Sequence, residues 1–384
     1  MGDRAVLACL STHVFFSWGV LYYTLPILNI RLAQEQGWST AFVAGVFSSA
    51  LLVAAVVGVP VGRLVDRHGP AVVMLVGALV AVVAMSLSVW TDQQAVFAAA
   101  WMVVGAAHSA TLYPPAFTAV ARWFDGRTTR PLTVLTLVGG ASSLAFAPVM
   151  AALADSISVR RTVWILAASY LVVAVVTTVL LRRRTWNHPT MTVASDRRDA
   201  VRNVVRSGRF IRLAIAMALG GAGLYAVTLN SVPLMVERGF TFREAATIFG
   251  LIGGGQLIGR IAFAPLSRRG TPVSRSVAQA AAAAIAILLM AAFGAPGLLV
   301  VTAAIFAGVV RGAHTLSTAA ALIDRWGTKN YGTVFGRFNF VVAAAIAVGP
   351  VLGEGLAAAM GSYEGAAWVL GGVAVLAIPL ARST

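Results

Sequence analysis

Long apolar runs recur from one end of the chain to the other and constrain its fold more than any other feature. A helix that crosses a bilayer needs about 17 to 25 residues, and each run is close to that length. Only 11% of the residues are charged, against about 25% in a typical soluble protein. The sequence therefore predicts an all-α membrane protein with twelve transmembrane helices. The expected spans are 5–30, 40–62, 71–90, 94–119, 129–154, 160–181, 209–236, 243–266, 273–293, 297–322, 332–355 and 364–381.

The basic residues lie mostly in the short segments between the apolar runs. With the N-terminus inside, the cytoplasmic segments hold 22 Lys and Arg residues and the outer loops hold five. This bias is typical of membrane orientation, so the net charge of +16 does not indicate nucleic-acid binding. We expect a plasma-membrane protein with both termini in the cytoplasm. The basic central linker is either a solvated tether or a contact to anionic membrane lipids.

No motif of a soluble enzyme occurs in the chain. The sequence has no nucleophile elbow, no P-loop and no histidine cluster at metal-ligand spacing. Cys9 is the one cysteine, which excludes an internal disulfide and a cysteine-based metal site. We therefore expect a protein that is not an enzyme and that uses no cofactor and no metal.

The two halves of the chain repeat each other. Residues of the same type recur at an offset of about 202: Gly19 and Gly221, Tyr23 and Tyr225, Glu35 and Glu237, Gly105 and Gly308, Pro148 and Pro350. The repeat predicts an N-terminal six-helix half over 1–181, a basic cytoplasmic linker over 182–208 and a C-terminal six-helix half over 209–384. Parallel repeats of this kind are typical of transporters that move two halves around a central site.

The eight residues from Gly62 to Gly69 have the sequence GRLVDRHG. They resemble the G-x-L-x-D-R-x-G loop of the major facilitator superfamily, and the resemblance implies the fold of that superfamily. We expect a tight turn with Gly62 and Gly69 at its ends, in which Asp66 faces a helix N-terminus and Arg67 a carboxylate. These four residues would form a gate on the cytoplasmic side. The alternative is a basic loop that serves membrane orientation alone.

Three further segments resemble the oxalate/formate antiporter and monocarboxylate transporter branch: Glu35–Ser39, Ala121–Phe124 and Ile323–Gly332. The resemblance covers the whole chain and implies a symporter or antiporter of small carboxylates, driven by protons or by exchange. In that branch an arginine of the eighth helix binds the substrate carboxylate, and Arg260 lies at the matching place. Gln256 stands where monocarboxylate transporters have an aspartate, and the eleventh-helix lysine of oxalate carriers is missing. These departures argue against simple proton symport and against oxalate.

The ionisable groups expected deep inside the spans are histidines and arginines: His13, His108, Arg260, Arg311 and His314. Every aspartate and glutamate is expected in a loop or near a helix end. A charge at bilayer depth is expensive and indicates a functional site. A positive core of this kind favours an anionic substrate, because guanidinium binds carboxylate through two parallel hydrogen bonds.

The predicted substrate-binding residues are Arg260, Gln256, Tyr23, Asn230, Arg311, His314 and His108. Structural roles remain open for all of them. Arg260 is alternatively held by backbone carbonyls, Arg311 belongs to a gate, and Tyr23 packs at an interface. The histidines either carry a coupling proton or are ordinary buried hydrogen-bonding residues.

Taken together, these features predict a secondary transporter of a small organic anion, a monocarboxylate, that works by alternating access as a monomer. Two other functions stay open. An exporter of a hydrophobic drug or metabolite would have a larger apolar pocket with no need of Arg260. A membrane sensor with a carrier fold would bind its ligand without moving it.

Overall fold

A computed structural model describes residues 2–124, 129–182, 197–267, 269–293, 297–327 and 331–384 of the chain. The described residues form helices and turns, and no strand occurs among them. They contain twelve helical stretches that are long and apolar enough to cross a membrane, as the sequence predicts. The chain divides into two compact units, Met1–Thr190 and Met191–Thr384. The predicted linker lies partly outside the described residues, at 183–196, and its remainder is mostly helical.

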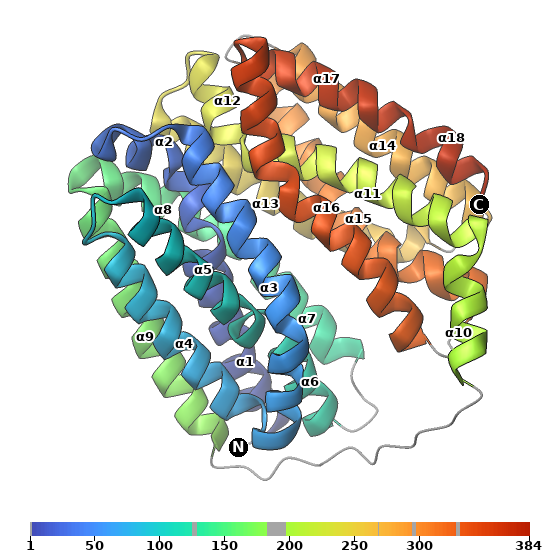
Figure 1. Cartoon of the computed structure of the whole chain (residues 1–384), viewed down its shortest axis with the longest axis horizontal. Helices are drawn as coiled ribbons and strands as arrows, with labels where there is room; N and C mark the ends of the chain where they lie inside the picture. Colours follow the sequence, from blue (N-terminus) through green and yellow to red (C-terminus); the bar gives the residue numbers. More distant parts are fainter. Residues whose placement is uncertain (1, 125–128, 183–196, 268, 294–296, 328–330) are drawn as a thin grey trace. The chain divides into compact units, whose positions relative to one another are not determined.

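The first unit holds the first six spans (Figure 1). Its helical elements are α1 (Asp3–Ser17), the π-helical segment η1 (Trp18–Tyr22), α2 (Thr24–Gln36), α3 (Thr40–His68), α4 (Pro70–Ser88), α5 (Gln94–Thr111), α6 (Tyr113–Phe124), α7 (Thr129–Gly140), α8 (Ser142–Ser156) and α9 (Val159–Arg182).

The second unit holds the other six spans. Its elements are α10 (Arg197–Arg206), α11 (Gly208–Leu229), α12 (Ser231–Glu237), α13 (Phe242–Leu266), α14 (Pro272–Ala292), α15 (Leu298–Trp326), α16 (Tyr331–Met360), α17 (Tyr363–Val375) and α18 (Ala377–Arg382).

Prolines explain most of the places where one span is split into two helices. A proline has no N–H to donate and its ring clashes with the carbonyl four residues earlier, so the preceding turn opens. The breaks at Tyr23, Leu112, Asn230 and Leu376 each lie two or three residues before a proline, namely Pro26, Pro114, Pro233 and Pro379. Pro60, Pro148 and Pro350 instead lie inside continuous helices.

The prediction of a loop from Gly62 to Gly69 is wrong at the Gly62 end. Helix α3 continues through this segment to His68, because no residue before Gly69 interrupts the helix. Gly62 therefore lies inside α3. Gly69 makes the turn alone, with a φ of 80° that favours glycine, and α4 begins at the next residue. Arg67 is exposed at the end of α3. The side chain of Asp66 lies outside the described part of the structure, so its gating role stays a prediction.

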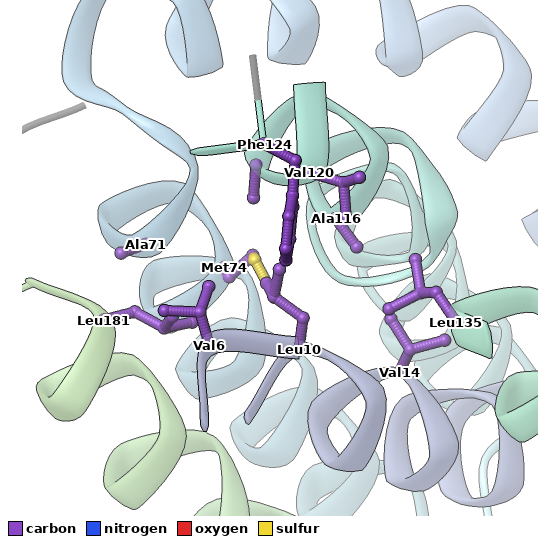
Figure 2. Close-up of a cluster of buried hydrophobic side chains, with 11 residues drawn as sticks. Val6, Leu10, Val14, Ala71, Met74, Ala116, Val120, Phe124, Leu135 and Leu181 are labelled. Atoms are coloured by element: carbon purple, nitrogen blue, oxygen red, sulfur yellow. The ribbon is translucent and has the colours of Figure 1, made fainter. Parts of the chain in front are cut away.

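A buried apolar cluster joins the helices of the first unit around α1 (Figure 2). Val6, Leu10 and Val14 recur every four residues and therefore lie on one face of α1. Met74 of α4 and Leu135 of α7 pack against that face. The remaining buried members come from α4, α6 and α9: Ala71, Ala116, Ala119, Val120, Phe124 and Leu181.

One glycine contact recurs in both units and supports the sequence repeat. A Cβ atom added to Gly105 of α5 would overlap the carbonyl oxygen of Ala50 on α3. In the second unit a Cβ on Gly308 of α15 would overlap the carbonyl oxygen of Ile252 on α13. Each pair of helices therefore packs backbone against backbone at the same place in its own unit.

A glutamate of the repeat caps the last long helix of each unit. The Glu35 carboxylate accepts hydrogen bonds from the backbone N–H of Val159, at 3.1 and 3.2 Å, where α9 begins. The Glu237 carboxylate accepts from the backbone N–H groups of Tyr363 and Glu364, at 2.7 and 3.1 Å, where α17 begins. The first N–H groups of a helix have no partner inside the helix and carry a positive partial charge, so a carboxylate stabilises them.

We expect Glu35→Ala to lower the free energy of unfolding by about 0.5 to 2 kcal/mol, the usual cost of losing a helix cap. Thermal unfolding of the purified protein in detergent measures this change. The matched control is Gln34→Ala, a neighbouring exposed position on α2. Equal melting temperatures for the two variants would show that the cap contributes nothing.

Candidate functional site

Arg311 of α15 is held against neutral side chains of α11 in the second unit. Its side chain is 2% exposed. The guanidinium carbon lies 4.0 Å from the centroid of the Tyr225 ring, and Nη1 donates to the Thr228 hydroxyl at 3.2 Å. That hydroxyl donates in turn to the Leu224 carbonyl at 2.7 Å, which leaves its oxygen to accept from Arg311. The arrangement orients a cation over an aromatic face, a contact worth about 0.5 to 2 kcal/mol.

Arg260 and Gln256 lie four residues apart on α13, where side chains share a face. Gln256 is buried and Arg260 is half-buried. The structure places Arg260 and Arg311 on neighbouring helices of the second unit, α13 and α15, which pack backbone against backbone.

Close helix packing fixes the position of Arg260 relative to α15. Cβ atoms on Gly255 and Gly259 would overlap the carbonyl oxygens of Ile305 and Val309. On the other side, a Cβ on Gly312 would overlap the backbone of Gln256. The glycines that precede Arg260 in the sequence thus let α15 approach, and they set the spacing between the two arginines.

His314 lies three residues after Arg311 on α15 and is 2% exposed. Its Nε2 atom faces Gly221 of α11, where a Cβ would lie only 2.9 Å away. The ring borders a small pocket that also contains Gln279 of α14. Within the described residues, neither ring nitrogen has a hydrogen-bond partner.

The structure does not place Asn230 with Arg311. The Asn230 side-chain amide donates to the Pro350 carbonyl of α16 at 2.9 Å. It fits there because Gly353 has no side chain, since a Cβ would overlap its Nδ2 atom. Asn230 borders a different small pocket, together with Tyr363.

His108 of the first unit holds the π-helical segment in place. Its Nε2 atom lies 3.1 Å from the Leu21 carbonyl oxygen. A carbonyl only accepts hydrogen bonds, so Nε2 carries the hydrogen and donates it. Among the described residues the Nδ1 atom has no hydrogen-bond partner. Tyr23 closes the π turn, with its backbone N–H donating to the Trp18 carbonyl at 3.2 Å. π-helical turns occur frequently at functional sites.

An aromatic cluster surrounds this turn and was missed by sequence reasoning, apart from Tyr23. The Trp18 ring lies 4.6 Å from the Tyr22 ring and 4.9 Å from the Tyr113 ring, between centroids. The Tyr22 and Tyr23 rings are 5.1 Å apart. The adjacent tyrosines in the first span are the only sequence signal, because Tyr113 joins them through packing.

His13 lies apart from the cluster, at 3.4 Å from both the Thr177 and Tyr170 hydroxyls.

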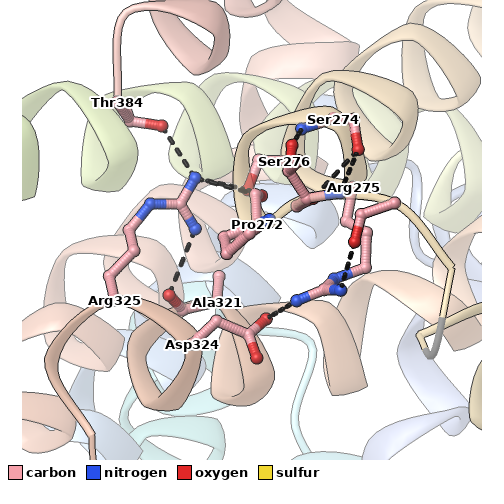
Figure 3. Close-up of polar contacts among 10 residues, drawn as sticks. Pro272, Ser274, Arg275, Ser276, Ala321, Asp324, Arg325 and Thr384 are labelled. Carbon is pink, nitrogen blue, oxygen red and sulfur yellow. Dashed lines mark hydrogen bonds and ion pairs between the residues drawn. The ribbon is translucent and has the colours of Figure 1, made fainter.

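Charged residues at one end of the second unit tie α14, α15 and the last residue together (Figure 3). Arg275 and Asp324 form an ion pair of 2.6 Å. Arg325 Nη2 donates to the Pro272 carbonyl, the Ser276 hydroxyl and the Thr384 hydroxyl, at 3.1, 3.1 and 2.9 Å. Asp324 and Arg325 belong to the segment 323–332, of which residues 328–330 lie outside the described structure.

Comparison with known proteins identifies the architecture. A family model described as Major Facilitator Superfamily matches residues 7–342. Among solved structures, a mutant of the nucleoside transporter NupG is similar, with a TM-score of 0.77 over 98% of this chain and 99% of that chain. The sequence identity is 13%, so this likeness concerns the fold. No curated protein matches the chain.

Proposed function

The chain belongs to the major facilitator superfamily and is a multi-pass membrane transporter, and from this premise we propose that it carries a small organic anion, a monocarboxylate. Transport would proceed by alternating access of the two halves. The chain is proposed to act as a monomer in the plasma membrane with both termini in the cytoplasm. The resemblance to the oxalate/formate and monocarboxylate branch supports the substrate class.

The observation that carries the proposal is the pair of arginines on two closely packed spans of the second unit. Arg260 lies on α13 and Arg311 on α15, and these helices meet backbone against backbone at Gly259 and Gly312, the residues next to the arginines. Two guanidinium groups inside apolar spans are costly, and a bound carboxylate offsets that cost through bidentate hydrogen bonds. In this proposal Arg260 holds the carboxylate, and Gln256 and Arg311 complete the site.

The other predicted site residues lie in different parts of the structure. Tyr23 and His108 lie at the π turn of the first unit, and their role as substrate-binding residues stays part of the proposal. His314 is the candidate for a proton site beside Arg311, and exchange is the alternative coupling mode. Asn230 holds α16 and would act on the site through that helix.

A thermal-shift screen with paired compounds tests this proposal. Small monocarboxylates are compared with their uncharged amides, which keep the size and lose the charge. A ligand at 100 times its dissociation constant stabilises the folded protein by about 2.7 kcal/mol. We expect stabilisation by carboxylates only, lost in Arg260→Ala and retained in Arg243→Ala, an exposed arginine of the same helix.

Two outcomes would contradict the proposal. Equal stabilisation by acids and amides, unaffected by Arg260→Ala, would favour an exporter of hydrophobic compounds. Carboxylate binding without uptake into proteoliposomes would favour a membrane sensor.

A further inference from the structure

Glu354 is a buried acid that belongs to none of the sites above. Its side chain is 3% exposed, on α16 inside a candidate membrane span. The predicted span 332–355 ends beside it, but α16 continues to Met360, so Glu354 lies more than one turn before the helix end. An ionisable residue in such a position is expensive and is usually functional.

The Tyr363 hydroxyl donates a hydrogen bond of 2.8 Å to Glu354 Oε2. Tyr363 begins α17, and its backbone N–H donates to the Glu237 carboxylate at 2.7 Å. This one residue therefore connects α16, through its hydroxyl, to α12, through its backbone. A hydrogen bond to a charged carboxylate is about twice as strong as one to a neutral group, so the connection depends on the charge of Glu354.

Glu354 also lies within a glycine- and proline-rich part of α16. Gly349, Pro350, Gly353 and Gly355 lie within seven residues, and proline and glycine are the usual causes of helix bending. Asn230 supports this segment from α11 through its bond to the Pro350 carbonyl. A small pocket lies between these elements, bordered by Asn230, Gly353 and Tyr363 and otherwise by aliphatic side chains.

Charged groups lie where α12 meets the start of α17. Glu237 accepts from the backbone N–H groups of Tyr363 and Glu364, and Arg238 of the turn after α12 interacts with both glutamates. Burial lowers the pKa of Arg238, while Glu364 and Glu237 oppose that shift. Helix α11 contributes the neutral Asn230, α15 carries no charged residue before Arg311, and α10 packs at the opposite end of α16.

We propose that Glu354 is a proton-binding site whose protonation releases α16 from Tyr363. A proton taken up by the carboxylate removes the buried charge and weakens the Tyr363 hydrogen bond. The glycine- and proline-rich segment of α16 is then free to bend. Proton binding stands on these contacts alone, whereas its coupling to transport rests on the proposed function.

Infrared difference spectroscopy of the purified protein in liposomes, titrated from about pH 4 to about pH 9 without substrate, tests the proton site. We expect a protonated-carboxyl band that Glu354→Gln removes. The control is Glu244→Gln, an exposed acid in the capping box of α13, where glutamine preserves the cap. A band that persists in Glu354→Gln, or one displaced by sodium ions at constant pH, would overturn the proposal.

The variant Tyr363→Phe tests whether the Tyr363 hydroxyl acts on the carboxyl group of Glu354, as the proposed proton site requires. The variant keeps the ring and the backbone bond to Glu237, and loses only the hydroxyl. We expect the Glu354 band to move in frequency. An unchanged band would show that the hydroxyl does not act on the carboxyl group.

Proteoliposome uptake then tests the coupling. We expect Glu354→Gln to lose accumulation driven by a proton gradient, down to simple equilibration, while substrate exchange continues. Gradient-driven accumulation at the wild-type level would overturn the coupling. If no carboxylate is transported at all, the proposed function fails, and the infrared result still decides whether Glu354 binds a proton.

Discussion

Arg311→Ala is expected to lower uptake of a small carboxylate into proteoliposomes by about 10- to 100-fold. Hydrogen bonds to charged groups are worth about 1.5 to 3 kcal/mol, and each 1.4 kcal/mol is a factor of ten. Arg311→Lys is expected to retain part of the activity. A lysine keeps the cation near Tyr225 but lacks the planar fork that binds a carboxylate through two bonds.

Arg243→Ala is the control for this experiment, because Arg243 is exposed at the beginning of α13 and is not part of the proposed site. Melting curves of each variant distinguish lost binding from lost folding, since Arg311 also contacts Tyr225 and Thr228. A folded Arg311→Ala variant with wild-type uptake would remove Arg311 from the substrate site.

Gly259→Ala is expected to destabilise the second unit by about 1 to 3 kcal/mol, the usual cost of overpacking. The added methyl group would overlap the carbonyl oxygen of Val309, which is backbone and cannot rotate away. The two helices have to separate, and Arg260, one residue later, moves away from α15. We therefore expect a lower melting temperature together with weaker carboxylate binding.

The same substitution at Gly372 of α17 is the matched control. A Cβ at Gly372 meets nothing within 4 Å, and alanine is favoured over glycine in a helix by about 1 kcal/mol. Gly372→Ala should therefore be neutral or stabilising. A similar loss of stability in both variants would show that close packing of α13 on α15 is not the cause.

The spans could be predicted from the sequence because the length of an apolar run is a local property. The expected spans 243–266 and 273–293 differ by one residue at most from Phe242–Leu266 and Pro272–Ala292. Span 332–355 is too short because Glu354 and Gly355 resemble a helix end. The burial of Glu354 depends on Tyr363 of another helix, and apolar length does not reveal that contact.

Arg260, Arg311 and Gln256 of the candidate site could be proposed from the sequence, but their neighbours could not. Arg260 and Arg311 stand out because each interrupts an apolar run. Their neighbours Tyr225 and Thr228 depend on which face of α11 meets α15, and Asn230 lies against α16 although it is only two residues from Thr228. The aromatic cluster around η1 likewise depends on packing between η1 and α6.

The central claim is that guanidinium groups of the second unit bind the substrate through its carboxylate. Counterflow in proteoliposomes tests it most directly, with a small monocarboxylate and its uncharged amide as competing external substrates. We predict exchange of the carboxylate alone in the wild type, and its loss in Arg260→Ala but not in Arg243→Ala. Equal exchange of acid and amide, or undiminished carboxylate exchange by Arg260→Ala, would contradict the claim.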